Sequence, residues 1–402
     1  MADSITVSPH ERLVKSISTP ELERRWKATR EMMREHGLDY LVIQNHEEFL
    51  GGAMRWLTDF AARHQYPMTV IFPVDDEMTM IACGLDAPAA QVYPPPSAAR
   101  GVKEVLGAGY FATIQYTNTY DAELAVGVLN GKRNPKIGWV EKAFIPVTFH
   151  DHIVKNLPGA SFVEATEWLD RLKAIKSTEE LELIQDCAVL QDGCMEHLRK
   201  TIKPGMHDYE VYAEAHYFCS LHGSSRGIVQ VGSGPLGTRV PFDFFRMQNR
   251  VIREGDQVSV LIEVNGPGGY YSEAMRTYMV GAEPSPVLQE ACAAALECEK
   301  MIAAGLVPGA DPKELWQAYV DFMVARDYAA PVRSFAHGQG LSLFERPNIR
   351  PDETWKIEEG MNIAVHPVAT RDDVLCIVCD GYIVEKGGGR LLHKMPMDII
   401  VV

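Results

Sequence analysis

The sequence has few of the features that mark a membrane protein, a secreted protein or a nucleic-acid-binding protein. Acidic residues outnumber basic ones, 54 to 39, and the net charge of −15 disfavours binding to nucleic acid or to an anionic membrane surface. No run of about 18 apolar residues is present, so we expect no membrane-spanning helix. Residues 1–12 contain no basic region followed by an apolar core, so we expect no signal peptide and a cytoplasmic location.

Cysteine is also sparse. The eight cysteines are scattered, and only Cys376 and Cys379 lie close together. In an intracellular chain we expect them to be reduced. An offset of three in an apparent strand directs these two side chains to opposite faces, and no second pair accompanies them, which disfavours a zinc knuckle. The 402 residues, 46% of them hydrophobic, instead indicate a globular enzyme of two or three domains.

One stretch, residues 251–280, has the pattern of a β-hairpin. Two apolar runs flank the turn sequence Asn-Gly-Pro-Gly-Gly at 265–269. Each run carries one carboxylate, Glu263 before the turn and Glu273 after it, and strand pairing would bring the two together. Strand glutamates often simply face solvent, so two exposed side chains remain the alternative.

A weak internal repeat follows this stretch. Residues 357–366 repeat the pattern of residues 252–261, with Glu-Gly at the same place and an apolar run after it. In this register His366 takes the position of Leu261, which has the same strand parity as Glu263. His366 and Glu263 would therefore line equivalent faces of two related strands. The carboxy-terminal part is expected to be a duplicated hairpin unit around one site.

The amino-terminal part alternates helix and strand patterns, which predicts an α/β domain ending near residue 172. Thr19 is expected to cap its first helix, which runs to Glu35 and ends at Gly37. The other expected elements are strands at 39–43, 66–73, 77–83, 136–140 and 161–164 and helices near 148–156 and 165–174.

The residues around the hairpin resemble a known family. The run from Ile262 to Thr277 resembles the strand pair of the creatinase, prolidase and methionine aminopeptidase family, called pita-bread. Residues 337–347, His-Gly-Gln-Gly-Leu-Ser-Leu-Phe-Glu-Arg-Pro, resemble the segment His-Gly-x-Gly-Leu-x-x-His-Glu-x-Pro of that family. Residues 176–184 and 202–206 resemble the segments that open its catalytic domain. The resemblance covers residues 176–402 in order and spacing.

The resemblance implies an α+β fold with two domains. Residues 1–172 would form an α/β creatinase-like domain, and residues 173–402 a catalytic pita-bread domain, in which helices surround the duplicated hairpin unit. In the resembled family, loops of the amino-terminal domain reach the active site of the partner subunit, so a homodimer is expected. Arg63 or His64 would then bind a substrate carboxylate, because the arginine fork suits that group. A surface turn is the alternative.

The ligand positions of the family are altered here. Its metal-dependent members hold two metal ions with two Asp, one His and two Glu. The resemblance assigns to these positions Glu263, Glu273, His337, His366 and Cys379. The two final carboxylates are thus lost, and Glu is longer than Asp by a methylene.

A further departure concerns the catalytic histidine that the family usually has a few residues after its Ser-Gly-Pro segment. This chain has Pro241 or Phe242 in its place. We therefore expect a site without metal or other cofactor. The alternative is a divalent metal such as Mn, Co, Zn or Fe bound by the altered set.

Without metal, the resemblance is greatest to creatinase and ectoine hydrolase, which hydrolyse C–N bonds of small zwitterions. We expect an amidinohydrolase- or amidohydrolase-like enzyme that cleaves an amide or amidine C–N bond of a small polar or zwitterionic compound by acid–base catalysis. His337 and His366 are the candidate bases. Glu263 or Glu273 would orient a histidine or bind a cationic group. Of two neighbouring buried carboxylates, one has a raised pKa and can donate a proton.

Other readings stay open. Cys379 is a candidate nucleophile if a histidine lowers its pKa, and otherwise joins Tyr270 as a candidate substrate-binding residue. The alternative functions are an X-Pro dipeptidase- or aminopeptidase-like metallohydrolase, a lyase acting on a small zwitterion, and a non-catalytic binding protein. Several ionisable groups in apolar strands argue against the last, because burying them without a use is costly.

Overall fold

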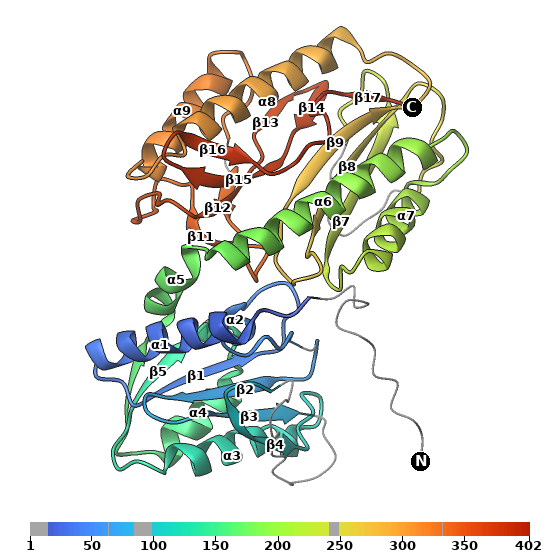
Figure 1. The fold of residues 1–402 in the computed structure, drawn as a ribbon. Helices are drawn as coiled ribbons and strands as arrows, with labels where there is room; N and C mark the ends of the chain where they lie inside the picture. The colour runs from blue at the N-terminus through green and yellow to red at the C-terminus, as the bar shows by residue number, and fades with distance from the viewer. Residues whose placement is uncertain (1–14, 63, 84–98, 241–248, 332) are drawn as a thin grey trace. The chain divides into compact units, whose positions relative to one another are not determined.

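The computed structural model describes residues 15–62, 64–83, 99–240, 249–331 and 333–402 (Figure 1). Contacts divide the chain into an amino-terminal unit, Ser16–Lys173, and a carboxy-terminal unit, Ala174–Val402, which Lys15 also joins. Each unit has hydrophobic clusters of its own. Within the described ranges, no helix is both long enough and apolar enough to cross a bilayer.

A six-stranded mixed sheet forms the centre of the amino-terminal unit, in the order β4-β3-β2-β1-β5-β6. Its strands are β1 Tyr40–Asn45, β2 Met68–Pro73, β3 Met78–Cys83, β4 Val102–Ala108, β5 Lys136–Val140 and β6 Ser161–Glu164. The helices are α1 Thr19–Glu35, α2 Ala53–Thr58, α3 Tyr120–Leu129, α4 Val147–Asn156 and α5 Thr166–Ala174, with short 3-10 helices η2 Gln115–Thr117 and η3 Lys142–Phe144. The expected hairpin of β2 and β3 is present, and β1, β5 and β6 run parallel. The predicted α/β architecture is confirmed.

The start of α1 differs from the prediction by one residue. Ser18, not Thr19, is the N-cap: its Oγ accepts a hydrogen bond from the backbone N–H of Glu21 at 3.2 Å, while Thr19 is already helical. Proline is tolerated in the first turn because its position there needs no N–H donor, so Pro20 lies inside the helix and the cap falls before Thr19. Gly37 follows the helix with φ +64°, a conformation that favours glycine.

In its described residues, the carboxy-terminal unit contains two larger sheets and a two-stranded ribbon. The carboxylate sheet, in the order β17-β9-β8-β7, consists of β7 Gly227–Pro235, β8 Asp256–Val264, β9 Ala274–Met279 and β17 Ile400–Val401. The histidine sheet, in the order β11-β10-β12-β15-β16, consists of β10 Ala336–Gly338, β11 Glu345–Asn348, β12 Asn362–Val365, β15 Asp380–Glu385 and β16 Gly388–Leu391. A separate ribbon pairs β13 Val368–Arg371 with β14 Val374–Ile377. Residues 374–377 therefore belong to the ribbon, whereas residues 380–385 belong to the histidine sheet.

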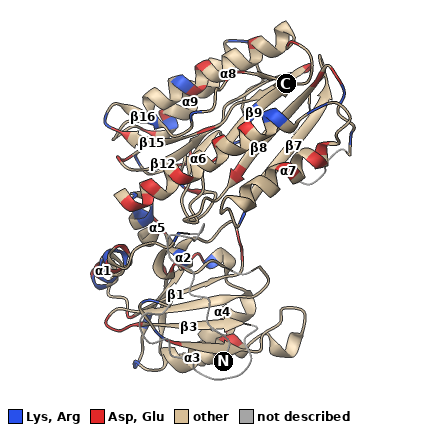
Figure 2. Ribbon diagram, turned by 45° about the vertical axis from the view of Figure 1, so that its right-hand side comes forward, with Lys and Arg blue, Asp and Glu red and all other residues tan. Residues whose placement is uncertain are grey.

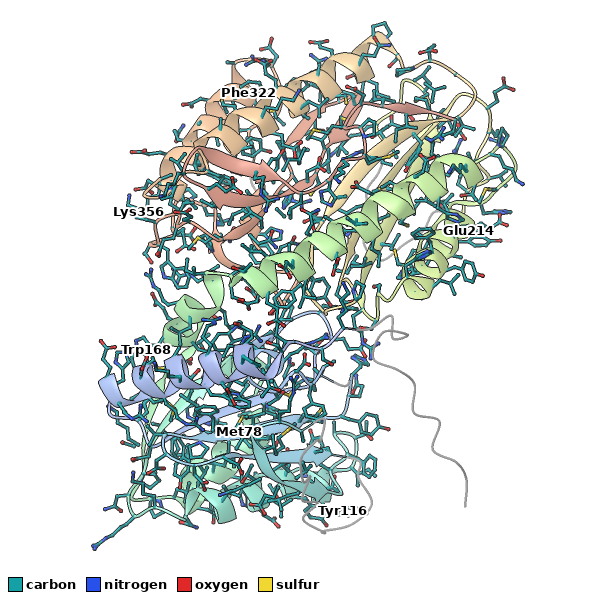
Figure 3. All side chains as sticks on the ribbon, in the orientation of Figure 1. Met78, Tyr116, Trp168, Glu214, Phe322 and Lys356 are labelled. Carbon is teal, nitrogen blue, oxygen red and sulfur yellow. The ribbon has the colours of Figure 1, made fainter. Side chains whose placement is uncertain are left out.

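Two pairs of helices cover these sheets. One hydrophobic cluster joins the carboxylate sheet to α6 Thr178–Thr201 and α7 Asp208–Leu221. Another joins the histidine sheet and the ribbon to α8 Pro286–Gly305 and α9 Pro312–Val324. Figure 3 shows side chains filling the space between helices and strands, with Phe322 of α9 labelled. The predicted α+β class is confirmed, with helices that surround the sheets of the carboxy-terminal unit.

The predicted hairpin of residues 251–280 is formed by β8 and β9, which pair antiparallel. Its turn lies against α6, and a Cβ at Gly266 would come within 2.7 Å of the Cys187 backbone. Only glycine permits this approach, so the glycine-rich turn fixes the hairpin on the helix. Figure 2 marks acidic residues at the start of α6, where Glu179 and Glu180 stabilise the positive end of the helix dipole.

Candidate metal centre and pocket

The two carboxylates of the hairpin face each other. The register of β8 and β9 pairs Ile262 with Ala274, and Asn265 forms a bridge with Tyr271, so one step beyond β9 Glu273 lies opposite Glu263. Glu263 is 6% exposed and Glu273 is 3% exposed. The alternative of two solvent-facing glutamates is therefore wrong.

The two histidines come from neighbouring strands of the histidine sheet. β10 carries His337, and His366 directly follows β12, its partner strand. The backbone N–H of His366 donates to the Phe335 carbonyl at 2.6 Å, and the two imidazole rings lie 5.2 Å apart at 60°. Phe344 stacks on His337 with ring centroids 3.9 Å apart. Strand pairing and stacking thus hold both imidazoles.

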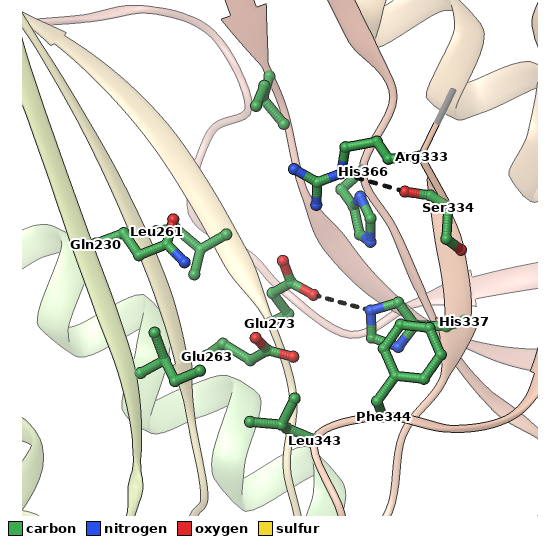
Figure 4. Close-up of a pocket in the computed structure, with 12 residues that line it drawn as sticks. Gln230, Leu261, Glu263, Glu273, Arg333, Ser334, His337, Leu343, Phe344 and His366 are labelled. Carbon is green, nitrogen blue, oxygen red and sulfur yellow. Dashed lines mark hydrogen bonds and ion pairs between the residues drawn. The ribbon is translucent and has the colours of Figure 1, made fainter. Parts of the chain in front are cut away.

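Glu273, His337 and His366 form a buried three-residue cluster, the metal cluster (Figure 4). One ligand atom from each lies within 4.8 Å of the other two, and His337 Nε2 is 3.6 Å from Glu273 Oε2. Among the described residues, neither Glu273 Oε2 nor His366 Nδ1 has a hydrogen-bond partner. A carboxylate and two imidazoles are the donors of a three-ligand catalytic metal site with an open position, so the cluster fits one divalent ion.

Protonation in the cluster also suits a cation. Burial raises the pKa of Glu273, but His366 and His337 outweigh it and bring the pKa to about 2. Burial lowers the pKa of His366 to about 4, against the opposing effect of Glu273. At neutral pH the carboxylate is therefore charged and the His366 imidazole is neutral, the states that metal ligands require.

Glu263 differs from Glu273 in protonation. Burial and the neighbouring Glu273 raise the pKa of Glu263 well above its ordinary value, which favours the protonated carboxyl. The side chain of Gln339 donates through Nε2 to Glu263 Oε1 at 2.9 Å and to the Leu343 carbonyl at 3.1 Å. Gln339 is fully buried and was not singled out in the sequence. The sequence feature that could have pointed to Gln339 is its position between two glycines of the resembled segment.

The cluster opens into a pocket of about 280 Å³. Apolar side chains make up much of the wall, and Gln230 of β7 and Arg333, just before β10, add polar groups. Sequence reasoning missed both. Gln230 is an amide inside an apolar strand, and Arg333 lies four residues before His337, so each had a weak signal.

Of the other predicted site residues, some are outside the described part of the chain and the rest do not line the pocket. Arg63 is outside the described residues, as are Pro241 and Phe242. His64 is an exposed residue of the amino-terminal unit, with Nε2 3.2 Å from the Gln65 amide nitrogen. Tyr270 is buried, and its hydroxyl donates to Glu180 Oε1 at 2.8 Å, away from the pocket lining.

Cys379 is buried beside the metal cluster but does not line the pocket. Burial and the charge of Glu273 raise the pKa of its thiol well above the ordinary value. A cysteine nucleophile needs the thiolate, which is disfavoured here. This environment argues against Cys379 as a nucleophile.

Comparisons with known proteins agree with the fold. Residues 182–394 match the metallopeptidase family M24, and residues 25–175 match the creatinase/prolidase N-terminal domain. An Xaa-Pro dipeptidase of Pyrococcus furiosus is 26% identical over 255 residues, 62% of this chain and 72% of that protein. An uncharacterized hydrolase/peptidase, y4tL, of Sinorhizobium fredii is 23% identical over 95% of this chain and 97% of its own length. Dipeptidase PepE from Mycobacterium ulcerans shares the fold, with a TM-score of 0.76 and 21% identity over 96% of this chain and 100% of that one.

These findings contradict the expectation of a site without a cofactor. The matched family is one of metallopeptidases, and Glu273, His337 and His366 provide a three-ligand set. The error arose because loss of carboxylates at two of five family positions was taken as loss of all metal binding. Three ligands are enough for one ion. Because the matched residues 182–394 make up more than half of the chain, this protein belongs to the hydrolases of metallopeptidase family M24 and carries a creatinase/prolidase amino-terminal domain.

Proposed function

We propose that this protein is a metal-dependent hydrolase that cleaves the amide C–N bond of a dipeptide, itself a small zwitterion. The observation that carries the proposal is the buried cluster of Glu273, His337 and His366 beside the pocket. Similarity to an Xaa-Pro dipeptidase supports the substrate class. The pocket volume of 280 Å³ supports a small substrate, because drug-sized ligands occupy about 300–1,000 Å³.

Glu273, His337 and His366 would hold one divalent ion, which supplies a Lewis acid for the substrate carbonyl and lowers the pKa of a bound water. The chain's own groups would hold the substrate and manage protons. As water adds to the carbonyl carbon and the C–N bond breaks, the leaving nitrogen must gain a proton. Glu263 is our candidate donor, supported by its raised pKa and by Gln339, which donates a hydrogen bond to one of its carboxyl oxygens.

Apolar side chains would exclude water from the reacting bond. Leu261, Leu343 and Phe344 line the pocket near the metal cluster, with Ile228 and Ile377 on the same lining. Such a wall suits an apolar substrate side chain and strengthens the electrostatic interactions inside the pocket. The expected homodimer, with Arg63 or His64 reaching the site of the partner subunit, stays a prediction, as does the cytoplasmic location.

Metal removal tests the proposal. The purified chain should contain close to one ion of Mn, Co, Zn or Fe by elemental analysis and should release proline from alanyl-proline. A chelator should abolish hydrolysis, and adding back one of these metals should restore it. Glu273→Gln, which keeps the side-chain shape but removes the charge, should lower both metal content and activity. A metal-free protein whose activity survives chelation would refute the proposal.

A further inference from the structure

The polar groups of the pocket outside the metal cluster indicate how a substrate is recognised. Figure 4 shows Arg333 extending over His366 into the pocket. Its Nε donates a long hydrogen bond of 3.4 Å to the Ser334 carbonyl, which leaves most of its N–H groups for a ligand. Within the described part of the chain, no carboxylate forms an ion pair with Arg333. A pocket arginine in this state is suited to bind a carboxylate.

Gln230 lines the same pocket from the carboxylate sheet. Gln230 is only 3% exposed, yet neither its Oε1 nor its Nε2 has a hydrogen-bond partner among the described residues. A buried amide without a partner costs free energy, so this position favours a ligand that supplies the missing hydrogen bonds. The amide offers both an acceptor and a donor to such a ligand.

Charge differs across the pocket. Gln230 pairs in register with Leu261 on β8, two residues from Glu263, so it lies on the side that carries Glu263 and the negatively charged Glu273. Arg333 comes from the segment leading into the histidine sheet and brings the positive charge. A zwitterion with its ammonium group toward Gln230 and its carboxylate toward Arg333 matches this distribution.

We propose that Arg333 binds the free carboxylate of a dipeptide and that Gln230 accepts a hydrogen bond from its ammonium group. Because the two residues bind the two ends of the substrate, the pocket selects dipeptides over peptides with a blocked or extended end. This inference rests on the proposed function and assigns its substrate specificity. Neither residue contacts the bond that is cleaved, so both act on binding more than on the chemical step.

The experiment compares alanyl-proline with its carboxy-terminal amide and its N-acetyl derivative. Arg333→Met should raise KM for alanyl-proline about 10- to 100-fold with little change in kcat, the loss expected for a charged hydrogen-bonding partner. It should leave KM for the amide unchanged. Arg333→Lys should fall between. Gln230→Leu should raise KM for alanyl-proline and spare the N-acetyl derivative.

A surface arginine gives the matched control. Arg390→Met removes an equal charge from a residue that binds Glu385 outside the pocket, and its KM values should equal those of the wild type. Equal losses on alanyl-proline and its amide in Arg333→Met, or the same loss in Arg390→Met, would overturn the inference. Thermal denaturation checks that each variant is folded.

A binding measurement distinguishes failure of this inference from failure of the proposed function. If the metal-loaded wild type hydrolyses none of the three compounds, the proposed function fails. Calorimetric titration of the same compounds still tests recognition. Tighter binding of alanyl-proline than of its amide, with the difference absent in Arg333→Met, supports the role of Arg333, and equal binding to the wild type refutes it.

Discussion

Two buried charged clusters lie side by side in the carboxy-terminal unit, and they differ in how fully their groups are paired. In the first, the closed cluster, Arg276 binds both oxygens of Asp380, at 2.8 and 3.1 Å, and His393 Nδ1 lies 3.0 Å from Asp380 Oδ1. Arg276 also donates to backbone carbonyls, and His393 Nε2 lies 2.9 Å from Gln191 Oε1. The second is the metal cluster, in which Glu273 Oε2 and His366 Nδ1 have no hydrogen-bond partner within the described ranges, and His337 Nε2 lies 3.6 Å from Glu273 Oε2.

The comparison of the two clusters distinguishes buried charges that stabilise the fold from buried groups that can bind a ligand. Both clusters draw on β9 and the adjoining strands, and both are almost inaccessible to water. A buried charge with a complete set of partners stabilises the arrangement of the two sheets, whereas unpaired ligand atoms beside a pocket indicate a place for something else. Burial alone does not identify a site, and neither does a buried unpaired atom such as Glu299 Oε2; the metal cluster differs because its unpaired ligand atoms belong to residues that line the pocket.

The largest expected effect comes from breaking the metal cluster. His366→Ala removes one of three ligands, so metal content should fall and hydrolysis of alanyl-proline should drop more than about 10³-fold. Folding should survive, because the lost ring borders a pocket that water can fill. Elemental analysis, kcat/KM and thermal denaturation measure the three properties.

A histidine of the closed cluster is the control for that variant. His393→Ala should keep its metal but lose stability, because the histidine bridges Asp380 and Gln191. If His366→Ala retained full activity, or if the two variants behaved alike, the distinction between the clusters would be wrong.

Breaking the closed cluster should instead unfold the protein more easily. Asp380→Ala leaves the Arg276 guanidinium buried without its carboxylate, and removing one partner of a buried ion pair costs about 3–5 kcal/mol. Urea denaturation measures this loss. Replacing both residues, Arg276→Met with Asp380→Leu, should cost less than Asp380→Ala alone, since no charge is then left unpaired. If the double variant were less stable than Asp380→Ala, Arg276 and Asp380 would stabilise the fold by more than neutralising each other's charge.

The sequence predicted those parts of the site that depend on local pairing or on a family pattern, and missed those that depend on distant segments. The facing of Glu263 and Glu273 followed from a local hairpin, whose register depends on side-chain alternation and a glycine-rich turn. His337 was found through its place in a family pattern, and His366 through the internal repeat as well as that pattern. Gln230 and Arg333 had no such pattern, because they reach the pocket from β7 and from a segment about a hundred residues later in the chain. Elements α2, β4 and α3 were also not predicted.

The error on metal has the same physical origin. A comparison of family positions shows which ligand types are present, but metal binding depends on the distances between the ligand atoms. That separation depends on long-range pairing, in which the Met275–Cys379 bridge joins the carboxylate sheet to the segment entering β15. Cys379 looked like a substitute ligand or nucleophile in the sequence, but its backbone carbonyl accepts from Met275 at 3.0 Å and its thiol is buried.

The smallest expected effect concerns Glu299 of α8, a buried carboxyl beside the closed cluster. Burial and then Asp380 raise its pKa well above the ordinary value, and the Tyr382 hydroxyl donates to Oε1 at 3.2 Å. The folded state therefore binds more protons than the unfolded state at any pH between about 4.5 and the raised pKa. Across that window the free energy of unfolding must fall as pH rises.

Glu299→Gln removes this titration and keeps an acceptor for Tyr382. Urea denaturation at several pH values should show the variant to be more stable than the wild type at pH 8, with the difference shrinking as the pH falls toward 5. Glu297→Gln changes the same charge at an exposed position of the same helix, where the pair with Arg326 contributes about 0–1 kcal/mol, so its difference from the wild type should be small at every pH. A Glu299→Gln difference that is constant across this range would mean that Glu299 is not protonated in the folded protein, and the closed cluster would then hold one more charge than the contacts of Arg276 and His393 neutralise.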